Sequence, residues 1–254
     1  MDIKRGYIID LDGTLLNGNR AYLGAYELIE TLKQANIPFL IMTNSVQSPD
    51  TIVKRLAEND IIVQATHVLN PIIAINTFLK EKHFTKPWII GSDSEKSQMP
   101  YRSETLAPDS IVLLDFEEIN VNYQCLNEIM LMMRKGIPTV TASGSTFYER
   151  RGEFRIDTGA FVKLLEASSG YDVEVVGKPS ASYFEMGLVQ LGCDSTGVTI
   201  IGDDVKTDIL GASKISARPI LVKTGKYKEG DENIFSNCEC FESLLEFAQR
   251  GLRG

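Results

Sequence analysis

The sequence predicts an α/β protein with a three-layer, Rossmann-like core around a parallel sheet, and a smaller α/β unit inserted into that core. Short apolar runs alternate with helical patterns along the chain, which is typical of α/β folds. The runs are apolar at consecutive positions, as in strands that are buried on both faces. Polar residues follow several of these runs, at the strand ends where open α/β sheets bind ligands.

Composition and charge exclude several classes of protein. With 254 residues, 43% of them hydrophobic, the chain can bury a sizeable core. The net charge of -8 argues against a nucleic-acid partner and against an anionic membrane surface. No stretch approaches the ~20 apolar residues that span a bilayer, and no signal-peptide pattern precedes the first strand. We therefore expect a cytoplasmic protein whose 4 cysteines, which show no Cys-x-x-Cys spacing, are reduced thiols.

The first predicted strand, residues 7–9, leads into Asp10 and Asp12. Two carboxylates at one strand end repel each other and are costly to desolvate, so a cation, or a proton on one of them, would relieve the site. Gly13 lets the chain turn sharply and brings backbone N–H groups toward a bound anion. An ordinary turn capped by Asp12 is the structural alternative.

Three helices and two strands are expected next. Apolar residues at helical spacing and the helix-start pattern Ser48-Pro49 predict helices over 25–35, 49–59 and 71–82. Apolar runs predict strands over 38–43 and 67–69. The first of these strands ends in Thr43 and Asn44, whose hydroxyl and backbone N–H groups can bind phosphate oxygens. A turn or a helix cap explains the same two residues without a ligand.

A second α/β unit is expected after a linker at residues 84–87. Its strands are predicted over 88–91, 111–116 and 139–141, and its helices over 123–135 and 159–168. We therefore expect two domains, a discontinuous core of residues 1–83 and 174–254 and an inserted domain of residues 84–173.

Three more core strands are expected, over 174–176, 198–201 and 219–222, with a closing helix over 243–249. The first ends at Lys178, whose charge needs a partner if it lies beside a buried strand, although an exposed loop lysine is the alternative. The second ends in a group of acids, and helix capping accounts for only one of them. These acids are Asp203, Asp204 and Asp208.

The string Asp10-Leu11-Asp12-Gly13-Thr14-Leu15 resembles the opening signature of the haloacid dehalogenase superfamily. Thr43, Lys178, and Asp203 with Asp208 match the other three motifs of this family in order and in strand-end context. The insert between the second and third motifs is similar to the family's larger α/β cap, called type IIA. Residues 158–167, followed by 177–179, resemble the subgroup of phospholysine phosphohistidine inorganic pyrophosphate phosphatases.

The resemblance implies a Mg²⁺-dependent phosphatase that acts on small phosphomonoesters or phosphoamides. Asp10 would attack phosphorus to form an aspartyl-phosphate, and Asp12 would act as general acid and then as general base. Thr43 and Lys178 would hold the transferring phosphoryl group. The remaining implied phosphate contacts come from Leu11 and Asn44.

The resemblance also implies the metal ligands. Mg²⁺ would be bound by the carboxylates of Asp10 and Asp203 and by the carbonyl of Asp12. Asp208 would orient Lys178. Asp204 has two interpretations, support for the metal ligands or a helix cap.

The cap would decide the substrate, which we expect to be a small phosphorylated molecule. Ser143, Ser145 and Tyr148 lie in the segment that faces the core site in the resembled subgroup, and the resemblance implies a homodimer formed through the cap. Residues 150–152 are expected at a solvated hairpin tip. His67 and His83 lie in no motif, and we expect both to be surface or structural groups.

Two other functions share this fold. A phospho-ligand binding or regulatory protein would keep the site with little turnover. A dehalogenase needs neither a general acid two positions after the nucleophile nor Mg²⁺, so Asp12 and Asp203 favour phosphate chemistry over dehalogenation.

Overall fold

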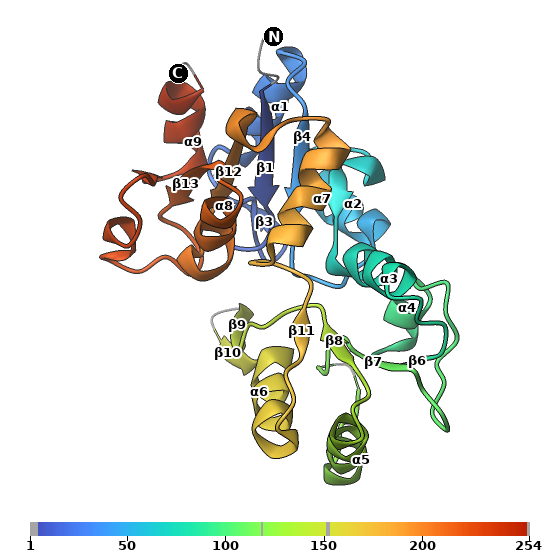
Figure 1. Cartoon of the computed structure of the whole chain (residues 1–254). Coiled ribbons are helices and arrows are strands. Elements are labelled where there is room, and N and C mark those ends of the chain that lie inside the picture. Colours follow the sequence, from blue (N-terminus) through green and yellow to red (C-terminus); the bar gives the residue numbers. More distant parts are fainter. Residues whose placement is uncertain (1–4, 118, 151–152, 253–254) are drawn as a thin grey trace. The chain divides into compact units, whose positions relative to one another are not determined.

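The computed structural model describes residues 5–117, 119–150 and 153–252, and the chain forms two compact units (Figure 1). The first unit, here the core, consists of Met1–Thr43, Pro49–Leu69 and Lys178–Gly254. The second, here the inserted unit, consists of Asn44–Ser48 and Asn70–Gly177. The inserted unit therefore extends beyond residues 84–173 on both sides.

The core is built on a six-stranded parallel sheet in the order β14-β13-β12-β1-β4-β5. The central strand β1 is buried at every position, and Ile9 pairs with Ile201 of β12 and Ile41 of β4. Parallel strands covered on both faces are apolar at consecutive positions, which explains the apolar runs in the sequence. The strands are β1 (Gly6–Asp10), β4 (Phe39–Met42), β5 (Val68–Leu69), β12 (Val198–Gly202), β13 (Arg218–Val222) and β14 (Glu239–Phe241).

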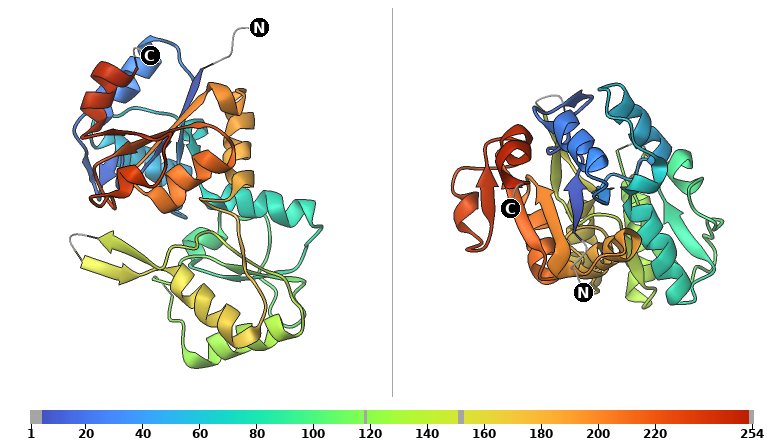
Figure 2. Two further views of the ribbon diagram at one scale, coloured as in Figure 1. Left: turned by 60° about the vertical axis from the view of Figure 1, so that its left-hand side comes forward. Right: turned by 90° about the horizontal axis from the view of Figure 1, so that it is seen from above.

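Helices cover both faces of the core sheet, as Figures 1 and 2 show. Alternate side chains of a strand point to opposite faces, so Tyr7 and Ile9 pack with α1 and α2. On the other face Gly187 of α7 packs against Ile8, Leu40 and Met42, and a Cβ there would lie 2.7 Å from the Met42 Cε. The helices are α1 (Ala25–Gln34), α2 (Pro49–Ala57), α7 (Ala181–Leu191), α8 (Leu210–Lys214), α9 (Leu244–Glu246), the 3₁₀ turns η1 (Ala65–His67), η2 (Ser195–Gly197) and η4 (Asp231–Asn233), and the π-helical turns η3 (Val205–Ile209) and η5 (Phe247–Gly251).

The chain forms a small antiparallel hairpin directly after the first strand. Its two strands are β2 (Leu16–Asn17) and β3 (Arg20–Ala21). Asn59, which follows α2, holds this hairpin, because its side chain accepts the N–H of Ala21 at 2.8 Å and donates to the carbonyl of Asn19 at 2.9 Å.

The inserted unit has its own parallel sheet, in the order β11-β8-β7-β6. Helices α5 and α6 pack on it through a buried cluster that includes Leu113, Ile129 and Leu165. The strands are β6 (Pro87–Ile90), β7 (Ser110–Leu113), β8 (Thr139–Thr141) and β11 (Glu174–Val175), with the antiparallel pair β9 (Phe147–Arg150) and β10 (Glu153–Ile156). The helices are α3 (Pro71–Glu81), α4 (Asp93–Lys96), α5 (Tyr123–Arg134) and α6 (Thr158–Ser169).

Two segments differ from their expected places. The prediction that the strand over 174–176 joins the core sheet is wrong, because β11 pairs with β8 of the inserted unit. Its first residues are also partly exposed, unlike those of the buried core strands. Helix α3 groups with the inserted unit because Asn70 and Asn76 donate side-chain hydrogen bonds to Gln98, at 3.0 and 3.3 Å.

Within the described residues, no helix has the length and apolar character that a membrane crossing requires.

Candidate active site

Four charged side chains gather in the core at the carboxyl ends of β1 and β12. The ammonium Nζ of Lys178 lies 2.5 Å from Asp10 Oδ1 and 2.7 Å from Asp208 Oδ1. Carboxylate oxygens of Asp10, Asp203 and Asp208 lie within 4.8 Å of one another. β1 and β12 are neighbours in the sheet, so their ends bring Asp10 close to Asp203, and Lys178, which is 168 positions from Asp10 in the chain, lies beside them.

All four side chains are buried, and this burial sets their electrostatics. Their exposed fractions are 6% for Asp10, 4% for Lys178, and 2% each for Asp203 and Asp208. Burial raises the pKa of Asp208 to about 7 against the opposing effect of Lys178, and burial together with the charges of Asp10 and Asp208 raises the pKa of Asp203 well above its usual value. Burial opposes the charge of Lys178, but the two carboxylates beside it outweigh burial and raise its pKa. The cluster thus holds more acid than its one lysine neutralises.

Asp10 offers the clearest position for a cation. Its Oδ1 accepts a hydrogen bond from Lys178, whereas its buried Oδ2 has no hydrogen-bond partner among the described residues. A buried carboxylate oxygen without a partner is costly. Oxygen ligands are those that Mg²⁺ prefers in proteins, so the donor set and the excess negative charge fit a divalent cation.

Asp203 is held in place by two segments of the core. Thr14 donates its hydroxyl to Asp203 Oδ1 at 3.1 Å, and the backbone N–H of Lys226 donates to Oδ2 at 2.6 Å. Gly13 and Gly225 allow this close approach, because a Cβ on either would lie 2.4 or 2.1 Å from Asp203 Oδ2. Both glycines also have positive φ, at 102° and 50°. The loop after β13 thus completes the site from a third strand end.

The other two acids of the β12 motif have different surroundings. Asp208 Oδ2 lies 3.3 Å from the N–H of Asp204 and 3.4 Å from the hydroxyl of Thr207, so both its oxygens already accept hydrogen bonds. Asp204 caps the turn η3 by accepting the N–H of Lys206 at 2.8 Å, and it lies 3.3 Å from the ammonium of Lys226. Of the two interpretations of Asp204, this geometry is that of a helix cap.

Thr43 lies at the end of β4, one residue beyond Met42, which pairs with Asp10. It is buried, and its backbone N–H donates to the carbonyl of Leu69 at 3.2 Å. The phenol oxygen of Tyr183 lies 2.8 Å from both the Thr43 and Leu69 carbonyl oxygens, so it can donate to either. This phenol fixes the end of β4 against β5.

Asp12 differs from the buried cluster because its side chain is 44% exposed. Its Oδ1 accepts a hydrogen bond from Arg55 Nη2 at 2.7 Å. Partial desolvation raises the pKa of the Asp12 carboxyl and the charge of Asp10 adds to this, while Arg55 opposes both. Leu11, between the two aspartates, has a buried side chain, and its carbonyl accepts the N–H groups of Leu15 and Leu16 at 2.9 and 2.8 Å.

The remaining predicted site residues, Asn44, Ser143, Ser145 and Tyr148, belong to the inserted unit. Ser143 Oγ accepts the N–H of Ser145 at 3.1 Å, and Ser145 Oγ donates to the carbonyl of Phe147 at 2.8 Å, so both hydroxyls shape the turn after β8. Burial and the neighbouring Glu117 carboxylate raise the pKa of Tyr148 to about 12. Residues 151 and 152 of the expected hairpin tip lie outside the described residues.

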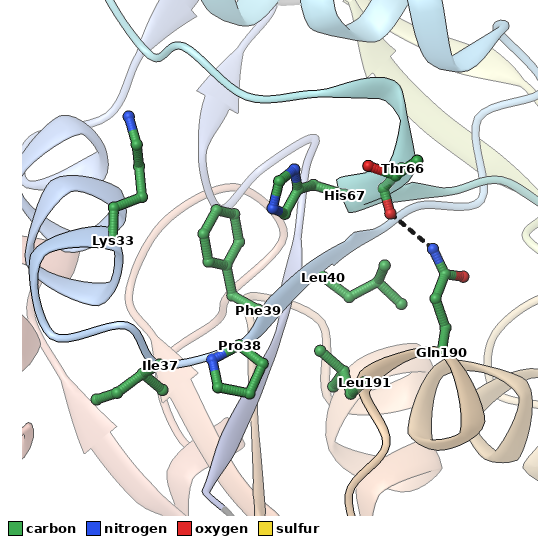
Figure 3. A pocket seen from close by; sticks show the side chains of 9 residues that line it. All are labelled: Lys33, Ile37, Pro38, Phe39, Leu40, Thr66, His67, Gln190 and Leu191. Atoms are coloured by element: carbon green, nitrogen blue, oxygen red, sulfur yellow. Dashed lines mark hydrogen bonds between the residues drawn. The ribbon is translucent and has the colours of Figure 1, made fainter.

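A separate pocket of about 340 Å³ lies at the amino end of β4 (Figure 3). Its lining includes Phe39, His67 and Leu191, and it contains none of the predicted site residues. The His67 ring stacks on Phe39 with 4.7 Å between ring centroids, and its Nδ1 accepts the N–H of Gln64 at 3.2 Å. His67 is therefore a structural group, as we expected.

Comparisons with known families agree with this geometry. A family model described as haloacid dehalogenase-like hydrolase matches residues 7–100, and a second one described as HAD-hydrolase-like matches residues 175–246. Together the two matches cover more than half of the chain and contain all four strand-end motifs. The chain belongs to the haloacid dehalogenase-like hydrolases.

Individual relatives of this hydrolase match over nearly their whole length. Human haloacid dehalogenase-like hydrolase domain-containing protein 2 is 26% identical over 248 residues, covering 95% of each chain. Human phospholysine phosphohistidine inorganic pyrophosphate phosphatase is 29% identical over 236 residues, covering 90% of this chain and 86% of that protein. The 4-nitrophenylphosphatase of Thermotoga maritima has a similar fold, with a TM-score of 0.86, 23% identity and 97% coverage of both chains.

Three contacts of this hydrolase's site were not foreseen in the sequence. These are the Thr14 hydroxyl on Asp203, the Arg55 guanidinium on Asp12, and the loop of residues 224–226. The loop had a usable signal, because Thr224-Gly225 lies one residue beyond a buried strand, at the ligand-binding end of the sheet. Arg55 had no such signal, since it lies in a helix with two other charged residues, Asp50 and Lys54.

Proposed function

We propose that this hydrolase is a Mg²⁺-dependent phosphatase that cleaves small phosphomonoesters or phosphoamides through an aspartyl-phosphate on Asp10. The observation that carries the proposal is the buried cluster in which Lys178 lies between Asp10 and Asp208, with Asp203 beside them and Asp10 Oδ2 without a hydrogen-bond partner in the described chain. The matched relatives named as phosphatases support the same chemistry.

In the first half of the proposed reaction, a carboxylate oxygen of Asp10 attacks phosphorus, and the bond from phosphorus to the leaving oxygen breaks. Asp12 gives its proton to that leaving oxygen, which departs as an alcohol. The raised pKa of Asp12 favours the protonated form that this step needs. Lys178 and Thr43 hold the phosphoryl oxygens and stabilise their developing charge.

In the second half, Asp12 takes a proton from a water molecule as that water attacks the phosphorus of the aspartyl-phosphate. The bond between phosphorus and the Asp10 oxygen breaks, which releases inorganic phosphate and regenerates both aspartates. Asp12 is exposed, so water and the leaving group can reach the residue that exchanges protons with them. Asp10, the proposed nucleophile, is buried among the charged side chains of the cluster.

The proposed Mg²⁺ would be held by the carboxylates of Asp10 and Asp203 and by the carbonyl of Asp12. When bound, the ion supplies a Lewis acid and offsets the negative charge of the acids and the phosphate. Asp208 acts as the residue that positions Lys178, because both its oxygens already accept hydrogen bonds from the chain.

We further propose that the core is the catalytic domain and that the inserted unit selects the substrate through the segment with Ser143, Ser145 and Tyr148. Asn44, which begins the inserted unit, is proposed to contribute to phosphate binding together with the backbone at Leu11. A homodimer formed through the inserted unit and a cytoplasmic location stay predictions.

The test is the replacement Asp10→Asn, which keeps the shape of the side chain but removes the nucleophile. We expect it to abolish the hydrolysis of p-nitrophenyl phosphate in the presence of Mg²⁺, with an unchanged circular dichroism spectrum. Asp60→Asn makes the same chemical change at an exposed residue and should leave turnover intact. Undiminished turnover by Asp10→Asn would remove Asp10 as the nucleophile.

The same preparations separate the two other functions. A dehalogenase would release halide from a haloacid in excess EDTA, whereas a phosphatase of the proposed kind would not. A phospho-ligand binding protein would bind members of a panel of phosphorylated metabolites without releasing phosphate from any of them.

A further inference from the structure

Arg55 makes a largely covered ion pair with Asp12. It lies in α2, and its Nη2 is 2.7 Å from Asp12 Oδ1 and 2.8 Å from the carbonyl oxygen of Gly18. The Arg55 side chain is only 15% exposed, whereas that of Asp12 is 44% exposed. An arginine that is covered while its acid stays accessible differs from an ordinary surface ion pair, in which both side chains move freely in water.

The backbone that carries Arg55 is itself fixed. Ile52 and Leu56 of α2 are buried in the main core cluster, which fixes the helix against the sheet. One helical turn after Arg55, Asn59 binds Asn19 and Ala21 of the β2–β3 hairpin. The helix and the residues directly after it thus hold the segment after β1 at two points, Arg55 and Asn59, and of these two the contact of Arg55 includes Asp12.

We propose that Arg55 is a positioning residue that holds the Asp12 carboxylate in the orientation needed for proton transfer. The inference rests on the proposed function, because it assigns Arg55 to the general acid of that reaction. Arg55 engages Oδ1, so Oδ2 is the oxygen that exchanges the proton with the leaving group. A displaced acid loses much of its effect, since a misplacement of about 1 Å can cost roughly 100-fold in rate.

The leaving group of the substrate provides a readout that a purely structural role would not change. p-Nitrophenolate leaves as a stable anion and needs little help from an acid, whereas an alkoxide such as that of glycerol phosphate must be protonated as it leaves. General acids typically contribute about 100- to 10,000-fold. Hydrolysis of the aspartyl-phosphate, in which Asp12 acts as base, is common to all esters, so the comparison uses kcat/KM, which reports the steps through release of the leaving group. Arg55→Met removes the charge at similar length, and we expect kcat/KM to fall tenfold or more on glycerol phosphate and less than threefold on p-nitrophenyl phosphate.

Two further variants test the link to Asp12. In an Asp12→Asn background, Arg55→Met should cause no additional loss of kcat/KM on glycerol phosphate, because the group that it positions is gone. Arg55→Lys retains the positive charge and should restore part of the lost kcat/KM. If Arg55→Met does not fold, Arg55→Lys can be compared with wild type on the same two substrates instead.

Asn59→Ala is the matched control, because it releases the same hairpin and keeps the Arg55 guanidinium, although it also removes the Asn59 side-chain bond to the Arg55 carbonyl at 3.1 Å. We expect it to leave the ratio of the two kcat/KM values unchanged. If Arg55→Met and Asn59→Ala lower kcat/KM on both substrates by one common factor, Arg55 only clamps the hairpin and the inference is wrong. An unchanged ratio in Asp12→Asn itself would instead refute the general-acid role of the proposed function, and inactivity of the wild-type protein on both esters would refute that function as a whole.

Discussion

Glu95 is a buried acid of the inserted unit whose ionisation should weaken the fold. It lies in α4 with 7% exposure, and its Oε2 accepts the N–H of Ser92 at 2.7 Å. Burial raises the pKa of Glu95 from 4.5 to about 7, the charge of Asp115 adds to this, and the hydrogen bond from Ser92 opposes it. Glu95→Gln keeps the size and an acceptor oxygen but removes the charge.

The sign of the effect follows from proton binding. Between pH 4.5 and about 7 the folded protein keeps the Glu95 proton while the unfolded chain has lost it, so stability falls as the pH rises through this range. Below pH 4.5 Glu95 is protonated in both states and does not destabilise the fold, and above pH 7 the destabilisation by its charge is constant. Each pKa unit corresponds to about 1.36 kcal/mol, which sets an upper value of ~3 kcal/mol for the gain of Glu95→Gln at pH 8.

Urea unfolding at pH 5 and pH 8 measures this gain. The fluorescence of Trp88, the protein's single tryptophan, reports the transition of the inserted unit, since it lies in β6. We expect Glu95→Gln to be more stable than wild type at pH 8 and nearly equal to it at pH 5. Glu81→Gln, at an exposed residue of α3, should change neither. An equal difference at both pH values would refute the reasoning, because ionisation would then not be its cause.

Two further predictions concern the site. Without metal, Asp203→Asn should raise the Tm because it removes one of the buried like charges, and calorimetry should show that Mg²⁺ raises the Tm of wild type but not of this variant. A ligand at 100 times its Kd stabilises by about 2.7 kcal/mol, so equal Mg²⁺ shifts in both proteins would contradict the proposed ligand set. Ser143→Ala and Tyr148→Ala should change kcat/KM by different factors among phosphate esters, within about 10- to 200-fold, and leave the Mg²⁺ affinity unchanged. A common factor for all substrates would show that this segment does not select them.

The parts of the fold that the sequence predicts well are those fixed by local pattern. The helices expected over 25–35, 71–82, 123–135 and 159–168 are confirmed within about two residues as α1, α3, α5 and α6, because each has one apolar face and clear end signals. The strands β1, β4 and β12 are confirmed because each is an apolar run that is buried at consecutive positions. A strand buried on both faces is a local property of the chain.

What the sequence predicts poorly depends on contacts between distant segments. The sequence predicts a strand at Glu174–Val175, but a pattern of two residues does not indicate which of the two sheets the strand joins. The strand expected over 111–116 ends at Leu113, since residues beyond it turn to hold α6 through the Thr158 hydroxyl on the Leu114 carbonyl. The charged cluster was predicted residue by residue from its motifs, whereas the Arg55 partner of Asp12, 43 positions away, carries no local mark.

The discontinuous core has a consequence for how the protein is made on the ribosome. The central strand β1 pairs on one side with β4, but its other neighbour, β12, begins only at Val198. During synthesis the whole inserted unit, through Gly177, emerges while one edge of β1, a strand that is buried at every position in the folded protein, has no partner. Unpaired apolar edges promote aggregation, so a slowly translated or truncated chain is exposed to it. Asp203 arrives with β12, and the nascent protein therefore gains its acidic cluster only in the step that closes this edge.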